Sequence, residues 1–193
     1  ISIRRNKRKE RGQMLSSPEL RRLIEHLEAA PPRTRDASEA ILLMLYTGCR
    51  SGEILRLTWN EVKEDHLALR TTKTGARTVQ LNTLARAVLN RRHRVGSLVF
   101  PSRLDPSKPI HCVDGTWAVA KEHCRLPKTL RLHDLRHTFA SHAILSGESL
   151  FMTGKLLGHR NPRSTERYAH LDGSTLREAS EKIAAEIETM MGG

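Results

Sequence analysis

The stretch ILLMLYTGCRSGE at residues 41–53 decides the fold. Its first half is an unbroken apolar run with no solvent-facing side, so the helix that we predict over Ala37–Thr47 belongs at the centre of a core. Gly48 ends this helix, and a short second helix is expected from Ser51 to Leu57. Arg50 lies at the junction of the two, where its side chain can point out of the core.

A helix precedes the core helix and a small sheet follows it. Ser16 or Ser17 is suited to cap the first helix, and apolar residues recur along one of its faces. Apolar and polar residues alternate around residues 66–71 and again around 79–81, which predicts two short strands joined near Gly75. From Thr83 onward the sequence has helical character with several breaks. The expected fold is therefore mainly α with a small antiparallel β-sheet at one edge, an α+β class.

The chain divides into three expected parts. Residues 1–13 are basic and almost free of apolar side chains, as is typical of a linker or a DNA-contacting arm. Residues 14–175 are long enough to form one domain with its own core. Residues 176–193 contain an amphipathic helix with Leu176, Ala179, Ile183 and Ile187 on one side. This last helix either packs on its own domain or is exchanged with a neighbouring molecule.

Charge and cysteine content restrict the function. The chain has 33 Lys and Arg residues against 21 Asp and Glu residues, a formal net charge of +12, which favours a nucleic acid as partner over a purely solubilising role. No apolar run approaches the roughly 20 residues of a membrane-spanning helix, so no membrane partner is predicted. Three cysteines without disulfide or metal spacing indicate reduced thiols and a cytoplasmic protein.

Three strings carry candidate chemistry: TGCRSGE at residues 47–53, LHDLRHTFA at 132–140, and LLGH at 156–159, with a tyrosine shortly after the last. Together, in this order, they resemble the tyrosine recombinase or phage integrase family. That family is marked by an early Arg, a His-x-x-Arg pair, a later His or Trp, and a Tyr nucleophile. The resemblance runs from about Met14 to Leu171. It implies a tyrosine recombinase catalytic-domain-like fold and a catalytic set of Arg50, Lys73, His133, Arg136, His159 and Tyr168.

Phosphodiester cleavage requires these residue types. Attack on a phosphate builds negative charge on its nonbridging oxygens, and guanidinium groups such as Arg50 and Arg136 match that charge with paired hydrogen bonds. A phenol is mostly protonated at neutral pH, so an attacking Tyr168 needs nearby cations or a base. The departing 5′ oxygen must acquire a proton, which a Lys on a flexible hairpin can supply, and Lys73 fits the family's catalytic lysine.

The resemblance also implies supporting roles. His133 is expected to assist proton transfer at the nucleophile, and His159 to hydrogen-bond the scissile phosphate. Glu53 matches an acidic position of the family that would orient Arg50 or His133. From its own position rather than from the resemblance, His137 is expected to pack or hydrogen-bond near Arg136 and to support the site.

Metals and cofactors have no expected place in this site. His133 and His137 are spaced like a pair of metal ligands on one helix face, but the sequence has no third ligand nearby. Neither a metal nor a nucleotide cofactor is therefore predicted.

The reaction implied by the resemblance is metal-independent and ATP-independent. The enzyme would cleave one strand of double-stranded DNA at a time, leave a 3′-phosphotyrosine and a free 5′-hydroxyl, and exchange strands within a homo-tetramer on DNA. Without DNA a monomer is expected. Site-specific integration of phage or mobile-element DNA is the favoured role because that branch of the family is the largest.

Complete members of the family also carry an amino-terminal DNA-binding domain, which this sequence lacks, so we expect one domain of a longer protein. Two alternatives stay open: a type IB topoisomerase, which shares the nucleophile and the cations, and a noncatalytic DNA-binding protein with a relic site. An intact set of catalytic positions argues against the relic.

Overall fold

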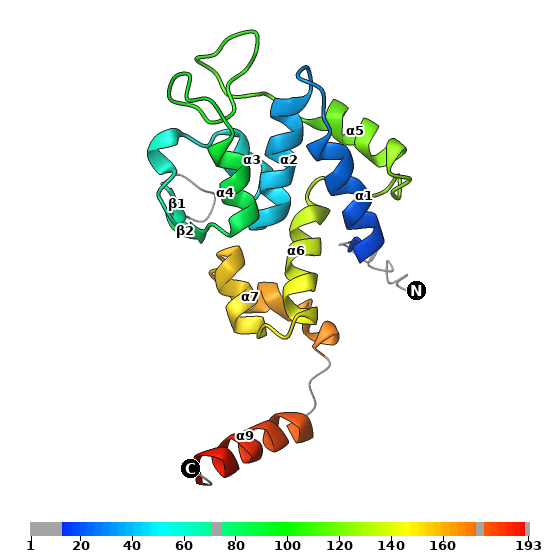
Figure 1. The fold of residues 1–193 in the computed structure, drawn as a ribbon, viewed down its shortest axis with the longest axis vertical. Coiled ribbons are helices and arrows are strands. Elements are labelled where there is room, and N and C mark those ends of the chain that lie inside the picture. The colour runs from blue at the N-terminus through cyan, green and yellow to red at the C-terminus, as the bar shows by residue number, and fades with distance from the viewer. Residues whose placement is uncertain (1–12, 71–74, 173–175, 192–193) are drawn as a thin grey trace, which may run out of the picture.

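The computed structural model describes residues 13–70, 75–172 and 176–191. These residues are mainly helical and include one two-stranded sheet (Figure 1), which confirms the expected α+β class. The elements, in chain order, are α1 (Ser17–Glu28), α2 (Arg35–Thr47), α3 (Ser51–Leu55), η1 (Trp59–Glu61), β1 (His66–Leu69), β2 (Arg77–Gln80), α4 (Thr83–Asn90), α5 (Asp114–His123), α6 (Asp134–Leu145), α7 (Leu150–Leu157), α8 (Arg163–Glu166), η2 (Ala169–Leu171) and α9 (Leu176–Met191).

Helix α2 is the centre of the main core. It packs against α1, α3, α4, α5 and α6, and its side chains from Ala37 to Thr47 are all buried. The helix begins two residues before the predicted start because Arg35 and Asp36, which are polar, form the first turn. It ends as expected at Gly48, whose φ of 63° is in the left-handed region that glycine adopts without strain.

The start of the described chain is fastened to α6. Ser16 caps α1 in a capping box with Glu19, as the sequence indicates. Just before it, the backbone N–H of Leu15 donates to Thr138 Oγ1 at 3.1 Å, and the carbonyl oxygen of Leu15 lies 2.9 Å from His142 Nε2. These contacts join α1 to the helix that carries the His-x-x-Arg string.

The two strands pair antiparallel at one edge of the body, as predicted. Their register joins His66 with Gln80 and Leu69 with Arg77. Val79 is buried, and period two places Arg77 on the same side of the strand. The sheet therefore presents one charged side chain toward the interior.

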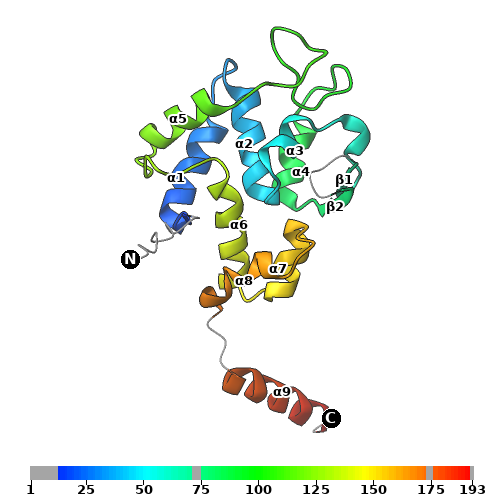
Figure 2. The same ribbon diagram turned by 180° about the vertical axis from the view of Figure 1, so that it is seen from behind.

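Helix α6 leads from the main body to a second, smaller cluster. There Ala140, Ile144, Leu157 and Tyr168 form a core of their own, covered by Phe139, Leu150 and Leu171. Figure 2 shows α7 and α8 gathered at this end of α6, away from α1 and α5. The segment that carries Tyr168 thus belongs to a small unit built on one end of a long helix.

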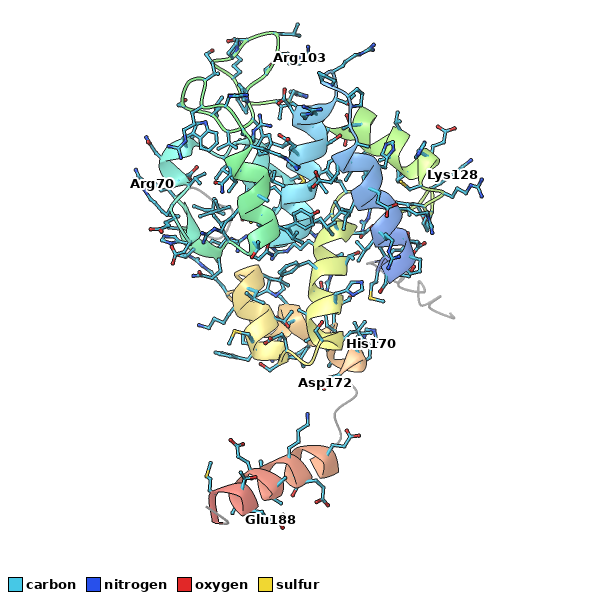
Figure 3. The ribbon with its side chains drawn as sticks, viewed as in Figure 1. Arg70, Arg103, Lys128, His170, Asp172 and Glu188 are labelled. Carbon is cyan, nitrogen blue, oxygen red and sulfur yellow. The ribbon has the colours of Figure 1, made fainter. Side chains whose placement is uncertain are left out.

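Other boundaries differ modestly from expectation. Helix α3 ends at Leu55 rather than Leu57, and one of the expected breaks after Thr83 extends from the end of α4 at Asn90 to the start of α5 at Asp114. Helix α9 stands apart from the body in Figure 1, and Figure 3 shows its side chains, Glu188 among them, on this separate helix. In the part of the chain that is described, no helix has the length and apolarity to cross a bilayer.

Candidate active site

A buried carboxylate organises the cations next to α3. Glu53 accepts hydrogen bonds from the backbone N–H of Arg50 at 2.9 Å, from Arg50 Nη1 at 3.0 Å and from Arg77 Nη2 at 2.8 Å. The Glu53 side chain is only 5% exposed, whereas that of Arg50 is 26% exposed. Arg50 is therefore the member of this trio that reaches solvent, at the helix junction where the sequence places it.

Arg136 is fixed by the ends of two other helices. Its Nη1 donates to the carbonyl oxygen of Gly48 and its Nη2 to that of Leu157, both at 2.7 Å. These carbonyls follow α2 and end α7, where helices leave acceptors without intrahelical partners. Arg136 thus fastens three helices together, and its guanidinium is held rigidly with only 4% of the residue exposed.

His159 follows the C-terminal glycine of α7 and faces the next short helix. Its Nδ1 lies 2.9 Å from the hydroxyl of Thr165, which is buried in α8. Gly158 has φ of 67° and ends α7 in the left-handed conformation that turns the chain toward His159. The hydrogen bond leaves Nε2 as the ring nitrogen that is open to a ligand.

Tyr168 is buried rather than exposed, which the sequence did not indicate. It is 5% exposed, and its hydroxyl lies 2.5 Å from His137 Nδ1. The hydroxyl therefore contacts His137, which was expected only to support the site, and not His133. The ring of His133 meets that of His137 edge-on with centroids 5.2 Å apart, and His133 lies at the surface.

The six expected catalytic positions are thus brought together in large part. Arg50, Arg136 and His159 surround the ends of α2 and α7, while His133 and Tyr168 flank His137 on α6. Lys73 lies outside the described residues. Glu53 and His137, the two supporting positions, both contact expected catalytic residues.

The ionisation of the site follows from burial and crowded positive charge. Burial, followed by the charges of Arg136 and Arg50, lowers the pKa of His159 to about 4. Burial, followed by the charge of His133, lowers the pKa of His137 to about 4 as well. Both imidazoles are therefore neutral at pH 7. Burial and the charge of Arg50 lower the pKa of Arg136 to about 10, so this guanidinium stays protonated.

The nucleophile candidate is held in its neutral form. Burial raises the pKa of Tyr168 above its ordinary value, although the charges of Arg167 and Arg136 act in the opposite direction. The pKa of Glu53 is lowered: burial opposes this, but hydrogen bonds from Arg77 and Arg50 prevail. The site in this state combines a phenol, two neutral imidazoles and an excess of cations, which is an arrangement suited to an incoming anion.

Sequence reasoning missed two contributors. Arg77 joins Glu53 and Thr165 joins His159, and neither residue belongs to the recognised strings. A signal for Arg77 was present, because strand alternation places it beside buried Val79, where a charge requires a partner. Among residues 13–70, 75–172 and 176–191, no three His, Cys, Asp or Glu side chains are grouped closely enough to hold a metal ion.

The arrangement matches a known class of proteins. The model of the phage integrase family matches residues 13–174, which is most of the chain. The chain therefore belongs to the phage integrase family, as its motifs predicted.

Named relatives agree with this membership. The chain is 29% identical over 188 residues to tyrosine recombinase XerA of Pyrococcus furiosus, covering 93% of this chain and 64% of the relative. It is 31% identical over 168 residues to tyrosine recombinase XerC of Xanthomonas axonopodis pv. citri, covering 83% and 54%. It is 30% identical over 149 residues to the integrase of Haemophilus phage HP1, covering 76% and 41%. The chain thus spans only part of the length of each of these relatives.

Solved structures show the same fold. The catalytic domain of bacteriophage HP1 integrase superposes with a TM-score of 0.71 at 25% identity, covering 88% of this chain and 94% of that one. The Tn1549 transposon integrase in complex with circular intermediate DNA superposes with a TM-score of 0.69 at 20% identity, covering 92% and 68%. The first of these comparisons covers almost a whole catalytic domain, so the described fold is that of a tyrosine recombinase catalytic domain.

Proposed function

We propose that this chain cleaves and rejoins DNA strands through a covalent 3′-phosphotyrosine at Tyr168, as part of a site-specific recombinase. One observation carries the proposal: two consecutive residues of α6 connect the two halves of the chemistry. Arg136 lies beside Arg50, Arg77 and their shared partner Glu53, a group called the cation cluster below, and His137 contacts the hydroxyl of Tyr168. Adjacent residues of one helix thereby contact the phenol and belong to the cation cluster.

The cleavage step uses the groups in these positions. The phenolic oxygen of Tyr168 attacks the phosphorus atom, the bond from phosphorus to the 5′ oxygen breaks, and Arg50 and Arg136 stabilise the charge on the nonbridging oxygens. His159, neutral and open at Nε2, donates a hydrogen bond to the same phosphate. Rejoining is the reverse attack by a 5′-hydroxyl, so the phosphotyrosine conserves the bond energy and ATP is not consumed.

Two proton transfers complete the step. We assign the phenolic proton first to His137, because its Nδ1 already contacts the hydroxyl and the neutral imidazole can accept. His133, edge-on to His137 and at the surface, is placed to pass that proton on. Lys73 is assigned the protonation of the 5′ oxygen, since the β1–β2 connection that carries it leads into Gly75. A Cβ added to Gly75 would lie 2.4 Å from the side chain of Arg160, next to His159.

The substrate is double-stranded DNA and the active assembly is a homo-tetramer on DNA, with a monomer in its absence. Such an enzyme works in the bacterial cytoplasm, where its DNA substrate lies.

Helix α9 is proposed to dock on a neighbouring subunit, because Ile183 and Ile187 are 61% and 50% exposed on a helix that stands apart from its own body. Ile187→Glu should abolish tetramers on DNA in mass photometry, whereas Glu188→Gln on the same helix should preserve them.

The central experiment traps the covalent intermediate. The protein is incubated with a library of DNA duplexes of randomised sequence. Each duplex carries a nick next to the cleavage position, so that the short strand released by cleavage diffuses away. An SDS-resistant adduct is expected with the unaltered chain and with Tyr46→Phe, which alters a buried tyrosine of the main core. Tyr168→Phe should give no adduct.

The alternatives give different outcomes in the same assay. Tight DNA binding without any adduct would support a noncatalytic DNA-binding protein and overturn the proposal. Adduct formation with plasmid relaxation, but without strand joining between two duplexes, would identify a type IB topoisomerase instead. Joined products from two duplexes are the result that supports recombination.

A further inference from the structure

Arg77 lies inside the cation cluster without a role in the cleavage scheme. It comes from β2, its side chain is 8% exposed, and it shares the interior face of the strand with Val79. Charged side chains are buried to this degree only with partners, so its surroundings show what it serves. Those partners belong to two segments that present catalytic candidates.

The first partner is Glu53. Arg77 Nη2 donates to Glu53 Oε2 at 2.8 Å, and Arg77 Nε lies 3.4 Å from Glu53 Oε1. The same carboxylate binds both the backbone and the guanidinium of Arg50. Arg77 therefore fixes, from the side of the sheet, the carboxylate that aims Arg50. A second, weaker contact from Nη2 to Cys49 Sγ at 3.4 Å reaches the residue before Arg50.

The second partner is the backbone that precedes His159. A Cβ added to Gly158 would lie 2.6 Å from Arg77 Cδ and 2.8 Å from Nη1, so the arginine packs directly on this glycine. In the opposite direction, Arg160 packs on Gly75, two residues before β2, where an added Cβ would meet Arg160 Nη2 at 2.4 Å. Each segment thus supplies an arginine that rests on a glycine of the other.

The contact with Gly158 leaves one donor of Arg77 unused. Its Nη1 is buried and has no hydrogen-bond partner among the described residues. The positive charge of Arg77 also reaches the neighbouring site, where it contributes to lowering the pKa of both Arg136 and His159. A buried, incompletely bonded guanidinium between two catalytic segments is costly for stability alone, which points to a use in the reaction.

We propose that Arg77 is a positioning residue for DNA cleavage, which holds Arg50 through Glu53 and the His159 loop through Gly158. It would thereby set the separation of two groups that must contact the same phosphate. A misplacement of such groups by about 1 Å can lower a rate on the order of 10²-fold. This inference rests on the proposed function, because its effect is defined by the cleavage step.

The test compares two substitutions that separate shape from charge. Arg77→Ala removes both, whereas Arg77→Lys keeps the charge but cannot bind Glu53 with two nitrogens. Arg86→Ala, an exposed arginine of α4, is the matched control. Single-turnover cleavage of a trapped duplex and the Kd for the same duplex are measured at a temperature at which circular dichroism shows each variant folded.

The expected result is a loss of cleavage rate without a comparable loss of binding. Arg77→Ala and Arg77→Lys should both cleave about 10- to 100-fold more slowly, with Kd changed less than about 3-fold, because the positioned geometry is lost in both. Arg86→Ala should cleave at the unaltered rate. Adding Glu53→Gln to Arg77→Ala should give little further loss, since the two residues act as one unit.

Two results would overturn the proposal. A folded Arg77→Ala protein that cleaves at the unaltered rate would leave Arg77 with a structural role only. An Arg77→Lys protein that cleaves at the unaltered rate would show that charge alone matters.

A separate measurement distinguishes failure of the Arg77 proposal from failure of the proposed cleavage function. Proton NMR titration of His159 requires no DNA and should give a higher midpoint in Arg77→Ala, because a nearby positive charge has been removed. Absence of any adduct from the unaltered chain, together with this shift, would reject the cleavage function while confirming the contact. An unchanged midpoint would contradict the contact itself.

Discussion

The cation cluster and the tyrosine segment are built in opposite ways. Arg50, Glu53 and Arg136 are tied into the large core around α2 by ion pairs and by carbonyls at helix ends. Tyr168 instead lies between α8 and η2 and belongs to a small separate apolar cluster, and its hydroxyl contacts His137. The proposed phosphate-binding groups are therefore fixed in advance, whereas the proposed nucleophile belongs to a unit with little core of its own.

If the proposed cleavage takes place, this difference predicts the order of its events. Local opening requires little free energy where few apolar contacts are broken, so the segment from Arg163 to Leu171 is the part able to shift when a phosphate arrives. The cations need no such rearrangement. For the proposed reaction, we therefore expect the contact between Tyr168 and His137 to control cleavage.

The largest expected effect comes from a substitution in the cation cluster, which is tied into the large core. Arg136→Ala removes a transition-state donor and leaves the carbonyls of Gly48 and Leu157 unpaired, so adduct formation should fall about 10²- to 10³-fold. The free energy of unfolding should fall by about 2–4 kcal/mol in urea titrations. Lys108→Ala is the control, since both side chains of its pair with Asp105 are exposed and such a pair is worth less than about 1 kcal/mol. An Arg136→Ala protein of unaltered stability would show that the cation cluster is held no more firmly than the segment around Tyr168.

The end of α2 provides a purely structural test of rigidity. Gly48→Ala forces a side chain into φ of 63° with its Cβ 2.7 Å from Phe139 Cδ1, so we expect a loss of about 3 kcal/mol in unfolding free energy. Gly52→Ala, whose Cβ meets nothing within 4 Å, should be neutral or slightly stabilising. Equal effects of the two substitutions in thermal unfolding would contradict a rigid junction.

The stored nucleophile should contribute far less to stability. Tyr168→Phe leaves His137 Nδ1 without its partner, so the unfolding free energy should fall by only about 1 kcal/mol. Amide hydrogen exchange should quicken in α8 and η2 and stay unchanged in α2. Quickened exchange throughout the protein would mean that the tyrosine segment is not a separate unit.

A separate expected effect is a pH dependence of stability that comes from the imidazoles of His137 and His159. The pKa values of His137 and His159 are lowered from 6.5 to about 4 in the folded chain, so the unfolded chain binds more protons below pH 6.5. The stability that these residues contribute is complete above about pH 6.5 and is lost as the pH falls toward 4. Urea midpoints at pH 7.5 and 5 should show this decrease, and His159→Asn should reduce it, whereas His170→Gln at the surface should not. A midpoint that rises at pH 5 would contradict the burial of these rings.

Much of this description could be predicted from the sequence, and the remainder has physical causes. The apolar run before Thr47 located the central helix, and Gly48 marked a turn that glycine adopts easily. The strings around Arg136 and His159 indicated which residues meet. The storage of Tyr168 on His137 could not be predicted, because a phenol among polar neighbours gives no sign of burial that depends on residues distant in sequence. Arg77 was missed because its partner, Glu53, is brought close only by the fold.

The central claim is that the phenolic oxygen of Tyr168 bonds to a DNA phosphate. Mass spectrometry of the trapped adduct, after nuclease and protease digestion, tests it most directly. A nucleotide phosphate on the peptide that contains Tyr168, and on no other peptide, is the result expected. A nucleotide on a different side chain, or a DNA-bound protein with every tyrosine unmodified, would contradict it.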